Sequence, residues 1–161
     1  MRRTSYPYVR RPRTRAMATV ELALVLPVLL LLLFGILEFG LLFKDALLLQ
    51  QACREAARAA AVGATPSQIE DTVTAAAPTL NSDNMEVTSE YRTWEGSGWS
   101  KWMDLGTASD GSSNDAPAGS QIRVSVTYLH PLITGGLFSW MATEPNENAV
   151  ELSSRAVCRR E

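Results

Sequence analysis

The sequence holds few of the residues on which catalysis and metal binding usually depend. Its 161 residues include one histidine, His130, and two cysteines, Cys53 and Cys158, which do not form the closely spaced pairs of a zinc site. His130 precedes Pro131 at the predicted end of a strand, where we expect packing or surface exposure rather than acid–base chemistry. A glycine-rich loop of the phosphate-binding type is also missing. We therefore expect no enzyme, no metal site and no cofactor.

Charge is absent from a long segment near the N-terminus. No residue from Leu22 to Leu37 is charged, and the apolar character resumes after Glu38 as far as Phe43. At about 1.5 Å per residue, a helix over residues 20–43 is ~36 Å long, which exceeds the roughly 30 Å of a hydrocarbon core. We therefore expect one transmembrane helix over residues 17–43.

The first 16 residues contain no acidic residue and six arginines, namely Arg2, Arg3, Arg10, Arg11, Arg13 and Arg15. The other nine basic residues of the chain stand against 17 acidic ones. Because arginines beside a span stay in the cytoplasm, we expect residues 1–16 to be a basic cytoplasmic leader and residues 44–161 to be extracytoplasmic. A leader this short, next to a span, favours a topology signal over nucleic acid binding. A cleavable secretory signal is the rival interpretation, although its apolar core usually has only about 7–15 residues.

The junction between leader and span carries the pattern of a known family. Ala16 is followed by Met-Ala-Thr-Val-Glu-Leu, with Glu21 as the lone acid, and then by an apolar run that contains Pro27. With Phe-Gly-Ile-Leu-Glu-Phe-Gly at 34–40 and Ala-Cys-Arg-Glu-Ala-Ala-Arg at 52–58, this pattern resembles the TadE-like family of tight-adherence (Flp) pilus proteins. Segments 124–132 and 152–161 are similar to the strand and the terminal strand of that family.

The resemblance implies processing and partners. In the family a prepilin peptidase cuts on the cytoplasmic side of the span and leaves a glutamate as the fifth residue of the mature chain. The matching cut here lies between Ala16 and Met17, which makes Glu21 the fifth residue. Ala16 departs from the glycine that is typical before the cut, and Leu22 from the aromatic residue that often follows the glutamate. The implied partners are a prepilin peptidase, inner-membrane pilus assembly proteins, other pilin-like subunits and the lipid bilayer.

The two acidic residues of the apolar segment require different explanations. A carboxylate in hydrocarbon is unfavourable by several kcal/mol unless it is paired. Cleavage after Ala16 would create an ammonium at Met17, about one helical turn from Glu21, and the terminus of a neighbouring subunit offers the same cation. We therefore expect Glu21 to fix the axial register between packed helices; the alternative places it in the headgroup layer. Glu38, ~25 Å further along the helix, is expected in the opposite, solvated headgroup layer.

Helix-forming residues continue beyond the span. Residues 44–62 contain neither Pro nor Gly, and Gly63 is a natural C-terminal cap. Small and apolar residues at helical spacing predict a stripe that docks on a sheet. The motif Thr-Pro-Ser-Gln at 65–68 predicts a second, short helix with a capping box, which Pro78 ends.

Alternating patterns predict strands in the rest of the chain, over 85–91, 121–128 and 149–158. The polar segment 106–119, rich in Gly, Ser, Asp and Asn, is expected to be a mobile loop. The predicted fold is an α+β membrane protein, with a single N-terminal transmembrane helix extended into a pilin-like scaffold helix that packs on a small antiparallel sheet.

Cysteine parity predicts a disulfide. Cys53 and Cys158 lie outside the cytoplasm in the expected topology, and an even cysteine count in an oxidising compartment favours a Cys53–Cys158 bridge. Two separate thiols are the alternative. The four tryptophans, at 94, 99, 102 and 140, leave two interpretations open, a binding surface or partial burial in the core.

The functional hypothesis is a minor pilin or pseudopilin that supports assembly of a tight-adherence (Flp, type IV-like) pilus for surface adhesion or secretion. The protein is expected in the cytoplasmic (inner) membrane, single-pass, with the N-terminus in and the C-terminus out. The alternative is a membrane-tethered extracytoplasmic binding domain that no prepilin peptidase processes. Cleavage of the leader distinguishes the two.

Overall fold

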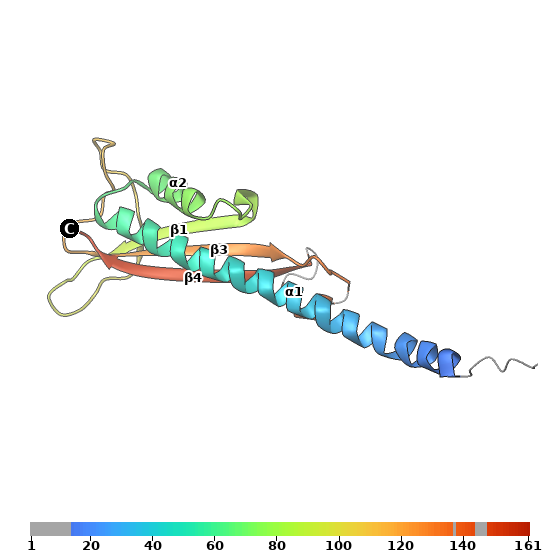
Figure 1. The fold of residues 1–161 in the computed structure, drawn as a ribbon. Coiled ribbons are helices and arrows are strands. Elements are labelled where there is room, and N and C mark those ends of the chain that lie inside the picture. Colours follow the sequence, from blue (N-terminus) through green and yellow to red (C-terminus); the bar gives the residue numbers. More distant parts are fainter. Residues whose placement is uncertain (1–13, 137, 144–147) are drawn as a thin grey trace, which may run out of the picture. The chain divides into compact units, whose positions relative to one another are not determined.

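The computed structural model describes residues 14–136, 138–143 and 148–161, and it is an α+β structure. The chain divides into two compact units, one that ends at Leu37 and one that comprises Glu38–Glu161. Helix α1 (Thr14–Ala61) contributes to both, and the sheet and second helix belong to the latter unit (Figure 1). The predicted fold class, a long apolar N-terminal helix extended onto a small antiparallel sheet, is confirmed.

Helix α1 ends where the sequence predicts. Gly63 follows it with φ +105°, a left-handed conformation that favours glycine, and its N–H donates to the carbonyl of Ala60. A Cβ at this position would also approach the Arg160 guanidinium to within 2.9 Å. Gly63 therefore serves both the end of the helix and the close passage of the C-terminal segment.

Helix α2 (Pro66–Ala76) begins with the predicted capping box. The Thr65 hydroxyl accepts from the N–H of Gln68, while the Gln68 side chain accepts from the N–H of Thr65. Ile69 and Val73, one turn apart, are buried on its inner face. The short helix is thus fixed by its cap and by these two side chains.

The sheet has four antiparallel strands in the order β2-β1-β3-β4. Their bounds are Met85–Arg92 for β1, Met103–Asp104 for β2, Gln121–Pro131 for β3 and Ala149–Arg159 for β4. A 3-10 turn, η1 (Ser82–Asn84), precedes β1, and another, η2 (Ser139–Met141), lies between β3 and β4. The three strands expected from alternation are present, and β2 is an addition that its two residues were too short to reveal.

The core lies between one face of the sheet and the two helices. From β3 it takes alternate side chains, and from α1 mostly small ones; its members include Leu49, Ala52, Cys53, Ala56, Ala57, Ala60, Ile69, Val73, Ile122, Val124, Val126 and Tyr128. Figure 1 shows the C-terminal half of α1 running along the sheet. Small residues bring the helix close to the strands, since the Cys53 thiol reaches the carbonyl of Val124 at 3.2 Å.

The segment 106–119, expected to be a mobile loop, has a structural role. Thr107 and Asn114 form a bridge across it, and Asn114 is buried. The Asn114 amide donates to the carbonyls of Ala60 at 2.9 Å and Ala64 at 3.0 Å. Ala60 lies in the last turn of α1, whose carbonyls lack intrahelical donors, and Ala64 lies just beyond the helix. Asn114 therefore caps the helix end from a distant part of the chain.

Candidate functional site

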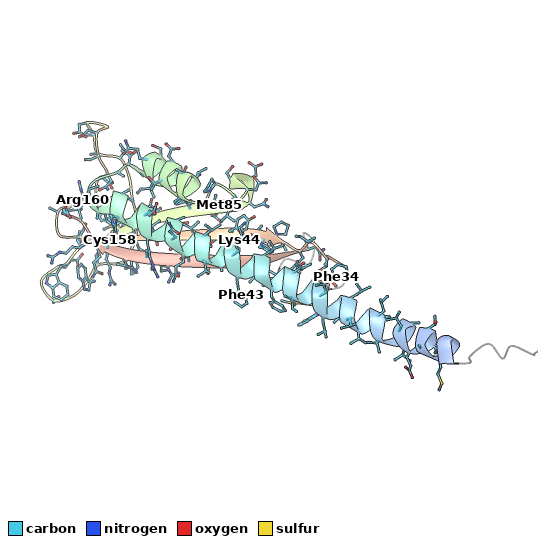
Figure 2. All side chains as sticks on the ribbon, in the orientation of Figure 1. Phe34, Phe43, Lys44, Met85, Cys158 and Arg160 are labelled. Carbon is cyan, nitrogen blue, oxygen red and sulfur yellow. The ribbon has the colours of Figure 1, made fainter. Side chains whose placement is uncertain are left out.

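The N-terminal part of α1 is the most distinctive surface of the chain. Within the described residues, α1 is the one helix long and apolar enough to cross a membrane, and its apolar window is not buried by other parts of the protein. Large side chains from Val20 to Phe39 are exposed around it, and Figure 2 shows them, Phe34 among them, projecting from the bare helix. Pro27 lies inside this segment, where membrane helices tolerate proline. The helix has the properties of a membrane anchor.

The residues predicted for processing lie at the start of this helix. Ala16 and Met17 are within α1, and the rest of the leader, up to residue 13, lies outside the described residues. Met17 and Glu21 are both exposed and stand four residues apart, a spacing that places them on one helix face. The cut after Ala16 and the register role of Glu21 stay predictions.

Glu38 differs from its expected solvated position. Its side chain is only 3% exposed, and it accepts three hydrogen bonds from the segment that follows β3. The donors are the N–H of Ile133 at 2.9 Å, the N–H of Thr134 at 3.3 Å and the Thr134 hydroxyl at 3.0 Å. The carboxylate is therefore an acceptor for an otherwise unpaired loop backbone, which explains an acid within an apolar segment.

A second acid on the same helix face was not singled out from the sequence. Asp45 lies two turns beyond Glu38, is buried, and its Oδ2 is 2.8 Å from Nδ1 of His130 on β3. Lys44 lies 3.5 Å from the other oxygen of the carboxylate. His130 has the predicted packing role rather than a surface one, being 4% exposed. The seven-residue spacing of the two acids, in line with the buried Leu49, is the sequence signal that could have located the pair.

Tyr128 shares this environment. Its ring lies edge-on to that of His130, with the two centroids 6.5 Å apart. Burial raises the pKa of the Tyr128 phenol, and the negative charge of Asp45 raises it further. The pKa of Tyr128 is therefore sensitive to the charge at Asp45.

The expected disulfide between Cys53 and Cys158 is not supported, because both cysteines are free thiols. The Cys53 thiol donates to the carbonyl of Val124 at 3.2 Å, whereas the Cys158 thiol donates to that of Ala57 at 2.9 Å. The two thiols thus bond to different backbone carbonyls, one on β3 and one on α1, rather than to each other. Figure 2 shows Cys158 beside the C-terminal turns of α1. Burial raises the pKa of both thiols.

The tryptophans divide between two places. Trp94 and Trp99 form an edge-to-face pair with centroids 5.4 Å apart on the hairpin after β1. Trp102 lies beneath the guanidinium groups of Arg92 and Arg123, at 4.5 and 4.1 Å from its centroid. Trp140 stands apart from this cluster in η2 and is 78% exposed. Trp94, Trp99 and Trp140 are thus exposed and Trp102 is half-buried, and none of the four belongs to the buried core.

Comparison with known proteins identifies the N-terminal segment. Residues 16–58 match the family model described as TadE-like protein. Over this segment the chain is similar to the TadE-like family. No curated protein and no solved structure matches the chain.

The TadE-like match extends from the predicted cut to the part of α1 that packs on the sheet. A TadE-like domain indicates involvement in tight-adherence pilus assembly. The match includes Glu21, Glu38, Asp45 and Cys53, whereas α2 and the sheet lie outside it. The acids of α1 therefore belong to the TadE-like segment, and their partners do not.

Proposed function

We propose that this TadE-like protein is a minor pilin or pseudopilin that supports assembly of a tight-adherence pilus. The family match over residues 16–58 is the observation that carries the proposal. The exposed apolar helix supports it, because such a helix suits both a bilayer and the packed helical centre of a filament. The role is structural rather than catalytic.

The proposed topology follows from the charges. The protein lies in the cytoplasmic membrane with the six arginines of residues 1–16 inside and the sheet domain outside. A prepilin peptidase would cut after Ala16, and removal of the arginines would free the helix to leave the bilayer. Inner-membrane assembly proteins and other pilin-like subunits are the further partners.

The mass of the protein extracted from its native membrane tests this proposal. A mature chain that begins at Met17 is expected. Ala16→Gly introduces the family's residue and should preserve or accelerate cleavage, whereas a bulky Ala16→Leu should stop it. Retention of Met1 in the natural protein would favour the alternative, a tethered domain that is not processed, for which the departure at Ala16 is the supporting observation.

Glu21 tests the assembly step separately. Glu21→Gln keeps the shape of the side chain and removes its charge, so membrane insertion should be normal and pilus assembly impaired. Glu55→Gln is the matched control, because Glu55 is an exposed glutamate of the same helix outside the apolar segment. Equal pilus yields from both variants would refute the register role of Glu21.

A further inference from the structure

We propose that residues 132–136 and 138–143, which belong to the connection between β3 and β4, form a second membrane contact, which seats the folded domain in the lipid interface through Ile133 and Trp140. The partner is the bilayer itself. The inference rests on the membrane location given under the proposed function, but not on cleavage or pilus assembly.

The depth of the connection follows from its hydrogen bonds. The N–H groups of Ile133 and Thr134 donate to the carboxylate of Glu38, so the chain touches α1 at the level of that residue. Glu38 stands five residues before Phe43, the end of the apolar segment, a distance of ~7.5 Å along the helix. The interfacial layer on each side of a bilayer is roughly 5–8 Å thick. With Phe43 at the outer edge of this interfacial layer, the backbone of Ile133 lies within the layer.

The exposure of the side chains agrees with this depth. Leu132 and Phe138 are buried and hold the connection on the domain. Ile133 is 72% exposed and Trp140 is 78% exposed, so most of each residue is free to contact lipid. Isoleucine gains from hydrocarbon, and tryptophan is the residue most typical of membrane interfaces. The connection therefore uses some apolar residues for folding and leaves others free to enter lipid.

The charge pattern separates this surface from the other aromatic one. No residue from Leu132 to Thr143 is charged, and seven of these residues are hydrophobic. The two acidic residues of the connection, Glu144 and Glu147, come after this stretch in the sequence. Trp94, by contrast, is flanked in the sequence by Glu95 and lies within two residues of Arg92. An uncharged apolar segment is compatible with burial in an interface, whereas the surroundings of Trp94 favour water.

The Glu38 contact also removes the main obstacle to this position. A free carboxylate and two unpaired backbone N–H groups would each oppose entry into a layer of low polarity. Here they satisfy one another, and Glu38 is nearly sealed from solvent. The loop therefore reaches the level of Glu38 with the N–H groups of Ile133 and Thr134 already paired.

Tryptophan fluorescence of the full chain in vesicles tests the proposal. The vesicles contain phosphatidylcholine and phosphatidylglycerol, with or without bromine on the acyl chains near the headgroup, where it quenches only nearby indoles. The natural chain has four tryptophans, and we expect bromine to quench the share contributed by one of them. Trp140→Phe should abolish this quenching, and Trp94→Phe, the matched change at another exposed tryptophan, should leave it intact.

A reciprocal measurement uses acrylamide, which quenches from the water. Acrylamide quenching is compared between the unfolded chain without detergent and the folded chain in vesicles. In vesicles, Trp140 should be protected from acrylamide and Trp94 should stay accessible to it. Circular dichroism checks that both variants fold. Equal bromine quenching in the two variants would overturn the proposal and leave the patch as a contact for protein. Carbonate extraction of the vesicles distinguishes failure of the membrane location from failure of this inference. If carbonate extracts the chain, the chain does not span the bilayer, and both proposals fail. If the chain is retained but bromine does not quench Trp140, only the inference is refuted.

Discussion

Removal of the Glu38 carboxylate should unfold the contact between α1 and the β3–β4 connection. Glu38→Ala deletes the acceptor of three hydrogen bonds and leaves the N–H groups of Ile133 and Thr134 without partners. Hydrogen bonds to a charged group contribute about 1.5–3 kcal/mol each, and an unsatisfied buried donor costs about 1–3 kcal/mol. Thr134 is only half-buried, so water can reach part of the loop and replace some of these bonds. We therefore expect the free energy of unfolding to fall by roughly 3 kcal/mol, which is less than the sum of these values.

Thermal unfolding measures this loss. The unit Glu38–Glu161 is of a size for which 1 kcal/mol shifts Tm by about 3–5 °C, so Glu38→Ala should lower the Tm by roughly 10 °C. The transition is followed by near-ultraviolet circular dichroism of the full chain in mild detergent. Glu38→Gln keeps one acceptor oxygen, so its Tm should lie between those of Glu38→Ala and the natural protein.

The control is another glutamate of α1. Glu55 is exposed, and its one hydrogen bond, from Gln51 at 3.4 Å, is a surface contact. Glu55→Ala should therefore change the stability by no more than about 0.5 kcal/mol. If Glu38→Ala melts at the same temperature as Glu55→Ala, the Glu38 contact does not stabilise the domain and the argument from its burial is refuted.

Further outcomes are expected for three parts of the structure: the two thiols, the Asp45–Tyr128 pair and Asn114. Both Cys53 and Cys158 should react with iodoacetamide only slowly in the folded protein at neutral pH and readily after unfolding, and peptide mapping without reductant should find no species that links them. Since burial raises the folded-state pKa of both thiols, their contribution to stability is complete below the ordinary thiol pKa and declines as the pH rises through the folded value, so denaturant midpoints should fall on the alkaline side. Asp45→Asn should lower the pKa of Tyr128 in a spectrophotometric titration, and an unchanged value would exclude the charge effect. Asn114→Ala removes the donor to the carbonyls of Ala60 in α1 and Ala64 just beyond it, and should lower the free energy of unfolding in urea by about 1–3 kcal/mol. A loss below about 0.5 kcal/mol would show that water replaces the Asn114 amide.

The elements predicted correctly are those that nearby residues determine. The capping box of α2 involves residues three apart, and the inner face of β3 follows from alternation within eight residues. The end of α1 at Gly63 likewise depends on local backbone chemistry. Patterns of this kind are complete within one segment of the sequence, so no knowledge of the fold is needed to interpret them.

The features that were missed depend on distant partners. Glu38 accepts from residues 95 and 96 positions away, and the sequence does not show that β3 ends at that level of α1. The disulfide prediction failed for a related reason, because cysteine parity contains no information on the register between β4 and the helix. Asn114 appeared as one polar residue of a loop, although it caps a helix that ends about 50 positions earlier.

The small side chains on the inner face of α1 limit how this domain can diverge. Ala52, Cys53, Ala56 and Ala60 are fully buried, and the helix lies near enough for a thiol to reach a strand carbonyl. A larger side chain at any of them would force the helix away from the sheet, whereas exposed neighbours such as Arg54 can change freely. Distant homologues whose strands have lost recognisable similarity should therefore still carry small residues at this spacing, and that periodic absence of bulk is the pattern by which to search for them.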